Sequence, residues 1–265
     1  MVEILEKVKI VTKDQIIHVQ NYLGEKYIEH VSDNCMILES GKCYGIIGES
    51  GSGGEVIASI LSGNIYLKEQ EIYVDSMKLD KKNIQKYGWY VGKKEYSKGI
   101  MKHEISVKKA LNSAIMKYHK FDTLEETMEM FHLKKELIEY KIYQYGWEKL
   151  RASLAIGYAN NKKIFCFPWM NSQFFYYSMT SSLVYRFFNK LKAEGCIIVL
   201  FTSKEENVKG LVDETIQINN PHFNYTVADN LETGQNYPDK TSCSITYDDI
   251  AQCTAGIFKS GRRRQ

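Results

Sequence analysis

The sequence lacks a strong excess of either charge, a long apolar run and any paired cysteine motif. It contains 35 lysines and arginines against 32 aspartates and glutamates, so its formal net charge is +3. A balance this close to zero gives no general reason to expect a nucleic-acid partner. The last residues, 261–265, form a short basic tail, which we interpret as a solvated chain end.

The cysteines and histidines show none of the common metal-binding patterns. The six cysteines include no C-x-x-C pair, and the six histidines form neither an H-x-x-x-H nor an H-E-x-x-H pattern. We therefore expect reduced thiols, no metal site and a cytoplasmic protein. The N-terminal residues alternate charged with apolar side chains, unlike a signal peptide, and no stretch approaches the roughly 18 apolar residues that span a bilayer.

The composition is that of a folded protein. The chain has 265 residues, of which 44% are hydrophobic and 25% charged, and this suits one large globular domain with or without an appendage. Beyond Asn220 the sequence becomes polar, with many Asn, Asp and Thr residues. We therefore expect a poorly packed C-terminal extension over residues 221–265.

A glycine-rich loop stands between a predicted strand and a predicted helix. The strand is the apolar run Cys43–Ile47, and the helix that follows has Val56, Ile57 and Ile60 on one face. Strand, glycine loop and helix in this order are the setting of a phosphate-binding loop, which reads G-x-x-x-x-G-K-[ST]. The candidate phosphate-binding residues are Gly48, Glu49, Ser50, Gly51, Ser52, Gly53, Gly54 and Glu55.

The loop departs from that pattern at the two positions that bind the phosphates and the metal ion. Gly54 replaces the lysine, and Glu55 replaces the Ser or Thr whose hydroxyl holds magnesium. A carboxylate at Glu55 would face the phosphates with like charge, which costs on the order of 1–4 kcal/mol at a few Å. Three interpretations follow: a chance turn, a nucleotide site that works by another route, or a nucleotide-binding fold without its chemistry.

Short β-prone runs alternate with helical stretches along most of the chain. The longest helical stretch is an insert of about 40 residues that starts at Ser106, with about three helices of ordinary length. Apolar strands that alternate with helices predict a largely parallel sheet covered on both faces. The predicted strands are 16–19, 35–38, 43–47, 71–74, 89–91, 163–167, 196–201 and 215–218.

The order of these parts resembles the nucleotide-binding domain of ABC transporters over about residues 16–220. The segment 61–79 is similar to the stretch after that family's first helix, and 102–111 to the start of its helical subdomain. The resemblance implies an α/β, P-loop NTPase-like ABC ATPase fold. This fold has a mostly parallel sheet, an antiparallel β subdomain and a helical subdomain at about 100–160, within a domain spanning 1–220.

The resemblance also implies that the catalytic positions are changed. In the family, the Walker B strand ends in an Asp that binds magnesium and a Glu that activates water, but Pro168 and Trp169 stand here. Neither side chain can bind a metal ion or accept a proton. Ser203 stands at the switch histidine, and Gly92 or Lys93 at the glutamine of the Q-loop. We therefore expect no catalytic residue.

The segment 144–167 is similar to the family's signature helix and the strand that follows it. Gly146 fits the first glycine of the signature, Glu148 its Gln or Glu, and Arg151 the arginine three residues later. Tyr145 and Trp147 occupy the serine and second-glycine positions, which in the family close over the ATP held by a partner cassette. Two large rings would obstruct that contact.

These features predict a pseudo-ATPase that binds no cofactor and has a structural or regulatory role in a transporter complex. The expected partners are transmembrane subunits, at the inner face of the cell membrane, and a homo- or heterodimer with another ABC ATPase subunit. We expect Tyr145, Trp147, Trp169, Phe174 and Phe175 to anchor that dimer. Two alternatives stay open: binding of ATP and Mg with slow hydrolysis in a heteromeric transporter, and a stand-alone regulatory or immunity-type binding module.

Overall fold

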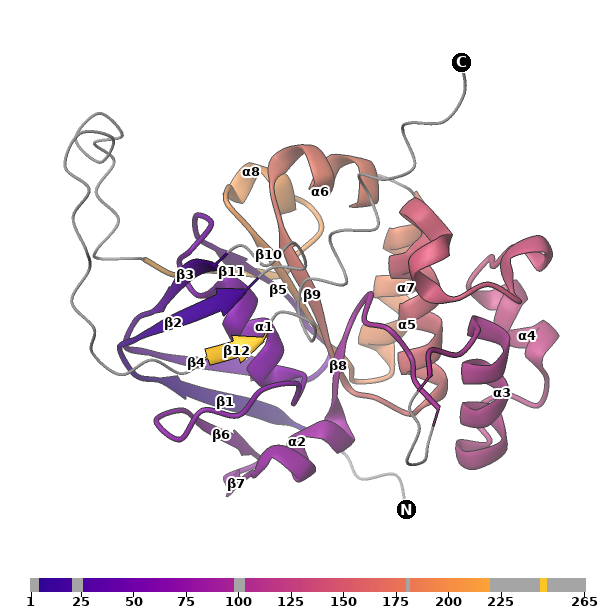
Figure 1. Ribbon diagram of the computed structural model, residues 1–265, viewed down its shortest axis with the longest axis horizontal. Coiled ribbons are helices and arrows are strands. Elements are labelled where there is room, and N and C mark those ends of the chain that lie inside the picture. Colours follow the sequence, from indigo (N-terminus) through magenta and orange to yellow (C-terminus); the bar gives the residue numbers. More distant parts are fainter. Residues whose placement is uncertain (1–4, 21–25, 98–102, 180–181, 220–243, 247–265) are drawn as a thin grey trace.

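The computed structural model describes residues 5–20, 26–97, 103–179, 182–219 and 244–246, and places helices on both sides of a central sheet (Figure 1). The strands are β1 (Lys7–Thr12), β2 (Gln15–Gln20), β3 (Lys26–Val31), β4 (Asn34–Glu39), β5 (Cys43–Ile47), β6 (Glu71–Val74), β7 (Met77–Lys78), β8 (Gly88–Tyr90), β9 (Ile164–Met170), β10 (Ile197–Thr202), β11 (Glu214–Gln217) and β12 (Ser244–Thr246). The helices are α1 (Gly54–Leu61), α2 (Lys81–Tyr87), α3 (Val107–Tyr118), α4 (Leu124–Met130), α5 (Lys149–Ala159), α6 (Ser172–Met179), α7 (Ser182–Ala193) and α8 (Glu205–Val208), with the 3-10 helices η1 (Lys135–Leu137) and η2 (Ile142–Glu148).

The central sheet is parallel throughout, in the order β11-β5-β10-β9-β8. All five residues of β5 and all six of β10 are buried. Strands buried on both faces read as continuous apolar runs, which is why the sequence revealed them. The predicted parallel sheet is confirmed.

An antiparallel sheet, β4-β1-β6-β7, lies on the side of α1 that faces away from the central sheet (Figure 1). Its strand β1 alternates buried Val8 and Ile10 with exposed Lys7 and Lys9, the period of a strand with one solvated face. The inward side chains pack in one core with α1, all of whose residues are buried. A third sheet joins β3, β2 and β12, and the rest of the expected extension over 221–265 lies outside the described residues.

The insert of about 40 residues that starts at Ser106 differs from the prediction of about three helices. Its described part has two α-helices, α3 and α4, followed by η1 and η2. The cause is competition for backbone carbonyls at the start of α3. The Val107 amide donates to the Tyr140 carbonyl at 2.9 Å, and the Lys108 amide to the Ile138 carbonyl at 2.8 Å. These carbonyls satisfy amides at the start of α3 that have no partner within their own helix.

The aromatic segment 174–188 forms parts of two helices, α6 and α7, and is divided between core and surface. Phe187 and Phe188 are buried on α7, whereas Tyr176 and Tyr177 on α6 are 64% and 59% exposed. No helix in the described ranges is long and apolar enough to cross a membrane.

Candidate functional site

The glycine-rich loop makes the tight connection from β5 to α1 that the sequence predicts. Gly51 and Gly53 have φ angles of 87° and 86°, a left-handed conformation in which a side chain would be strained. Gly48 leaves the sheet at the end of β5, where its amide donates to the Thr202 carbonyl at 2.9 Å. Residues 48–55 therefore lie around the N-terminus of α1, as a phosphate-binding loop does.

The side chain that fills this loop is Glu29, which comes from β3. Its Oε2 accepts a hydrogen bond from the Gly53 amide at 2.8 Å, and the Gly51 amide also bonds to the carboxyl group. Glu29 is only 4% exposed. Burial, together with the nearby Glu55, raises the pKa of Glu29 to about 8, against the lowering effect of the two amides. A protein carboxyl group thus takes the place in which phosphate oxygens would lie.

Strand β3 is fixed on the loop by backbone contacts as well. The His30 amide donates to the Gly51 carbonyl at 2.8 Å. A Cβ added at Gly53 would lie 2.8 Å from the His30 carbonyl oxygen, closer than real Cβ contacts come. His30 is itself buried, and its Nε2 lies 2.8 Å from Asp14 Oδ1. The close approach of two backbones explains why only glycine fits at position 53.

Glu55 is buried at the first turn of α1, where the phosphate-loop pattern has Ser or Thr. Its Oε1 accepts a hydrogen bond from the Tyr90 hydroxyl, and its Oε2 accepts one from the Trp169 amide at 2.8 Å. Burial raises the pKa of Glu55 to about 7. The sequence-based expectation placed this carboxyl group toward the phosphates, but it is directed at β8 and β9 and links both strands to α1.

Trp169 covers the other side of the loop. Its indole Nε1–H donates to the Gly48 carbonyl at 2.9 Å. A Cβ added at Gly54 would lie 3.2 Å from Trp169 Cδ1, tighter than an ordinary contact. A lysine at position 54 would therefore compete with the indole ring for space. The replacements at 54 and 169 fit each other sterically.

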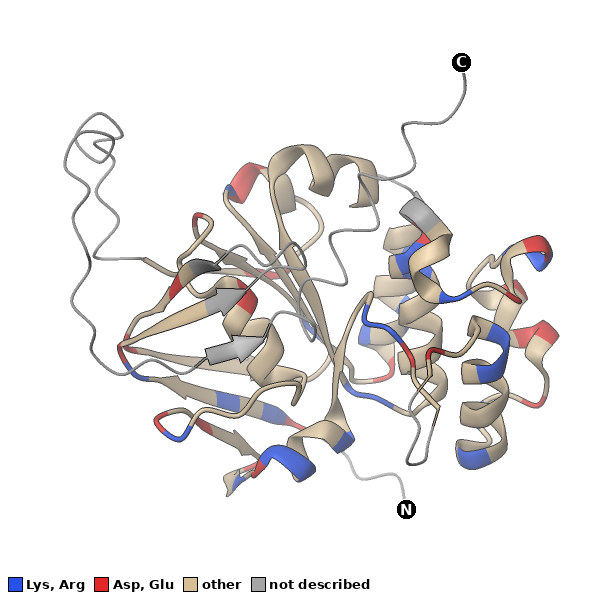
Figure 2. Cartoon of the chain, in the orientation of Figure 1, with Lys and Arg blue, Asp and Glu red and all other residues tan. Residues whose placement is uncertain are grey.

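The loop has no basic side chain of its own to neutralise a phosphate. The sequence contains no Lys or Arg between Cys43 and Leu67, and α1 carries no blue segment in Figure 2. Among the residues that the structure describes, no Lys or Arg contributes to the pKa of Glu29 or Glu55. In the same residues, no group of three or more His, Cys, Asp or Glu side chains could hold a metal ion. A triphosphate would meet carboxyl groups and an indole ring here.

The signature-like residues lie in η2 and at the start of α5, where they pair within the helical subdomain. Glu148 Oε1 lies 2.8 Å from Lys134 Nζ, and its Oε2 lies 3.1 Å from Arg151 Nη2. Gly146 and Trp147 belong to η2, but their surroundings are outside what the structure describes. The predicted residues Gly146, Glu148 and Arg151 thus lie close together along η2 and the start of α5. Glu148 and Arg151 form an ion pair.

Two of the expected dimer anchors are wrong. Tyr145 is 4% exposed and Phe175 is 2% exposed, so both side chains are buried in the core of this chain and are not available to a partner. Phe175 and Met179 lie one helical turn apart on α6 and share its buried face. The half-buried Trp169 is bonded to Gly48, as described above.

The residues at the Q-loop position are also held by internal contacts. The Gly92 amide donates to the Ser153 hydroxyl of α5 at 2.6 Å, and Lys93 Nζ lies 4.0 Å from the centre of the Trp89 ring. Ser203 is half-buried directly after β10.

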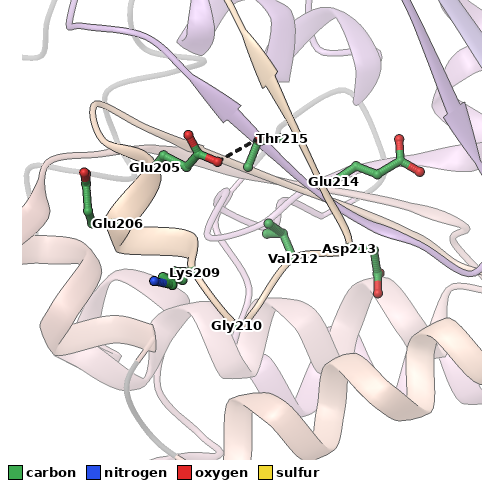
Figure 3. Close-up of a pocket in the computed structure, with 8 residues that line it drawn as sticks. All are labelled: Glu205, Glu206, Lys209, Gly210, Val212, Asp213, Glu214 and Thr215. Atoms are coloured by element: carbon green, nitrogen blue, oxygen red, sulfur yellow. Dashed lines mark hydrogen bonds between the residues drawn. The ribbon is translucent and has the colours of Figure 1, made fainter.

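A pocket of about 430 Å³ lies away from the loop, between α8 and β11 (Figure 3). Half of its lining residues are acidic, and Glu205 accepts a hydrogen bond from Thr215 at 3.2 Å. Asp213 and Glu214 are already paired with Lys192 and Lys42, at 2.8 Å and 2.5 Å. The charge of this lining does not suit a nucleotide phosphate.

The comparison with protein families identifies the fold that this geometry suggests. The family model for ABC transporters matches residues 31–167, just over half of the chain. The chain belongs to the ABC transporter family. It is an ABC nucleotide-binding domain by fold, and the predicted resemblance is confirmed. A search of curated proteins found no match.

Solved structures of ABC transporter cassettes share this fold. A bacterial ABC transporter cassette solved as a dimer is 20% identical, with a TM-score of 0.54, and the match covers 80% of this chain and 94% of that one. An ATP-binding subunit of an ABC transporter is 14% identical, with a TM-score of 0.54 over 80% and 85% of the two chains. CbiO1 from Clostridium perfringens, part of the ABC transporter complex CbiONQ, is 13% identical, with a TM-score of 0.51 over 82% and 85%. At these identities the likeness concerns the fold alone.

The sequence analysis of this ABC domain did not identify Glu29, whose carboxyl group lies near that of Glu55, or Tyr90, which donates to Glu55. No strand was predicted over Lys26–Val31. The available signal was weak: Glu29 stands two residues before the apolar Val31 and therefore on the same face of any strand there. An acidic residue in phase with a buried valine was the only indication of an inward carboxyl group.

Proposed function

We propose that this chain is a pseudo-ATPase, a cassette subunit that neither binds Mg·ATP productively nor hydrolyses it. Its role is structural or regulatory, in the place that an ATP-binding subunit has in an ABC transporter complex. The candidate phosphate-binding residues 48–55 would then serve the packing of the chain.

The observation that carries this proposal is the position of Glu55. The residue that would hold magnesium is buried and bonded to the Tyr90 hydroxyl and the Trp169 amide. Trp169 in turn stands at the Walker B position and bonds to Gly48 in the loop. In this connected cluster Trp169 can neither bind a metal ion nor accept a proton, and the carboxyl group of Glu55, which could do either, is already bonded to Tyr90 and Trp169.

The proposed partners follow from the family. The solved relatives include a dimeric cassette and a member of a transporter complex. By analogy, the chain would form a homo- or heterodimer with an ABC ATPase subunit and bind transmembrane subunits at the inner face of the cell membrane. Its own interface would rest on direct protein contacts, because no ATP would bridge the two cassettes.

Thermal unfolding with Mg·ATP tests the proposal. A ligand at 100 times its Kd stabilises a folded protein by about 2.7 kcal/mol, which raises the Tm of a chain of this size by roughly 5–10 °C. We expect no saturable rise in Tm up to millimolar Mg·ATP, and no phosphate release above a protein-free blank. An intact cassette from a related transporter provides the positive control. A saturable rise would contradict the proposal.

The same titration with Glu55→Gln distinguishes two causes of failure to bind ATP: exclusion of the nucleotide by the carboxyl group of Glu55, and the absence of residues that bind it. This variant keeps a side chain of the same size and removes the charge. We expect it to remain unresponsive to Mg·ATP, because Gly54 still supplies no cation. Binding in the variant alone would mean that a single carboxyl group excludes the nucleotide.

Purification from native membranes tests the proposed setting. We expect the chain to be recovered with a multi-span membrane protein and a second cassette. Recovery with neither would contradict a place in a transporter and would favour the stand-alone binding module.

A further inference from the structure

The amide cradle of the glycine loop is intact although the residues that serve the nucleotide are not. Gly51 and Gly53 keep the left-handed conformation that turns successive amides toward one point, and such concave sets of amides bind anions. Both amides meet the carboxyl group of Glu29, Gly53 at 2.8 Å to Oε2. The cradle therefore has an occupant, which the chain itself supplies.

Glu29 occupies the position in the cradle that a bound anion would take. Its carboxyl group is buried, and the groups that act on it are the two loop amides and Glu55. The strand that carries it is bonded to the loop through the His30 amide, which keeps β3 beside the cradle. A phosphate in the cradle would have to displace this carboxyl group.

We propose that Glu29 is a built-in ligand of the glycine loop, which holds the loop in its ligand-bound shape and excludes external phosphate. This inference rests on the proposed function, in which the site carries out no hydrolysis. It adds that the site is closed by an intramolecular contact and is not merely short of a lysine. In such an arrangement the loop connects β3 to α1 and stabilises their packing.

Replacement of the side chain by an external carboxylate is the most direct test. Glu29→Ala removes the carboxyl group and leaves both amides facing a cavity. Acetate supplies the same carboxyl group with the same hydrogen-bonding oxygens, so it should bind there. At ten times its Kd, added acetate should raise the Tm of Glu29→Ala by about 3–5 °C in a saturable manner, at constant ionic strength with chloride.

The matched control is Asp33→Ala, just after β3. Asp33 Oδ1 accepts a hydrogen bond from the Asp14 amide at 2.7 Å, so this variant also loses a carboxyl group bonded to backbone, but outside the cradle. Neither it nor the unaltered chain should respond saturably to acetate. An identical acetate response in all three proteins would overturn the proposal.

Hydrogen exchange provides a second measurement if Glu29→Ala does not fold. Glu29→Asp shortens the side chain by one methylene and withdraws the carboxyl group from the amides. The Gly51 and Gly53 amides should then exchange about tenfold faster than in the unaltered chain, while amides of β10 should not change. Unchanged exchange at the two glycines would overturn the proposal.

Inorganic pyrophosphate distinguishes failure of this inference from failure of the proposed function. Acetate rescue without Mg·ATP hydrolysis supports both. Hydrolysis by the unaltered chain would contradict the proposed function. Slower exchange of the loop amides when pyrophosphate is added to the unaltered chain would contradict the built-in ligand alone, because phosphate would then reach a cradle that Glu29 should fill.

Discussion

At the scale of single residues, the site is defined by two carboxyl groups held in an apolar environment. Burial raises the pKa of Glu29 to about 8 and that of Glu55 to about 7, each from an ordinary value of 4.5. Amide and hydroxyl donors offset only part of the cost of burial, since both pKa values remain high. These two residues therefore make the stability of the fold depend on pH.

The sign of that dependence follows from proton linkage. A carboxyl group with a raised pKa in the folded state binds its proton more tightly when folded, so its contribution is complete below pH 4.5 and is lost as the pH rises to about 8. We expect the unfolding free energy of the unaltered chain to fall over this window by a few kcal/mol more than that of Glu29→Gln. Urea denaturation at pH 5, 6.5 and 8 measures the difference.

The comparison between the two proteins cancels the titration of the groups that do not interact with Glu29, whereas Glu55 is coupled to it. Substitution of the exposed Glu136 to Gln provides a control for the loss of one acidic residue elsewhere. Parallel stability curves for the unaltered chain and Glu29→Gln between pH 4.5 and 8 would mean that Glu29 is not held as described.

At the scale of elements, the sequence predicted the strands that are buried on both faces and missed those that depend on their neighbours. The apolar runs of β5 and β10 could be read directly, because nothing polar interrupts them. Strand β3 carries Lys26, Glu29 and His30, and it is held by pairing with β2 and by the loop. Such a strand has little local signal.

The segment around η1 and η2 shows why periodicity can be correct when the type of helix is not. Ile138, Ile142 and Tyr145 are all buried at helical spacing, so the pattern located the inward face. The hydrogen bonds of this segment depend on a distant part of the chain, because amides at the start of α3 donate to the carbonyls of Ile138 and Tyr140. This competition is tertiary and leaves no trace in the local sequence.

Helix α5 offers a test of element packing with an unusual sign. Gly157→Ala in an ordinary helix stabilises it by about 1 kcal/mol. Here an added Cβ would lie 2.6 Å from Trp89 Cγ, near the base of a rigid ring of β8. We expect Gly157→Ala to lower the unfolding free energy by about 1–3 kcal/mol, measured by denaturant unfolding.

Ser113→Ala on the exposed side of α3 is the matched control and should change the unfolding free energy by less than about 0.5 kcal/mol. A stabilised Gly157→Ala protein would show that α5 is free to move away from β8. The packing of the helical subdomain on the sheet would then be looser than described.

At the scale of the whole molecule, the described part of the chain forms two hydrophobic cores, one on each side of the central sheet. The core on the side of α1 includes the inward side chains of β1, β4 and β6, and the other core joins α3, α5 and α7. The buried members of both lie between Leu5 and Ile218. This distribution supports the proposed domain over residues 1–220.

A chain that ends at residue 219 tests this domain boundary. It lacks β12, which adds only a short parallel pairing to β2. We expect it to fold, with a Tm within about 3 °C of the full chain, because both described cores remain complete. A loss of cooperative unfolding would contradict the boundary and assign a stabilising role to 220–265.

The account as a whole depends on the glycine loop being filled from within. A crystal structure of the full chain grown with Mg·ATP tests this most directly. The predicted result is an unchanged hydrogen bond from the Gly53 amide to Glu29, with no triphosphate at the N-terminus of α1. An ordered triphosphate and metal ion beside Gly54, with Glu29 displaced, would contradict it.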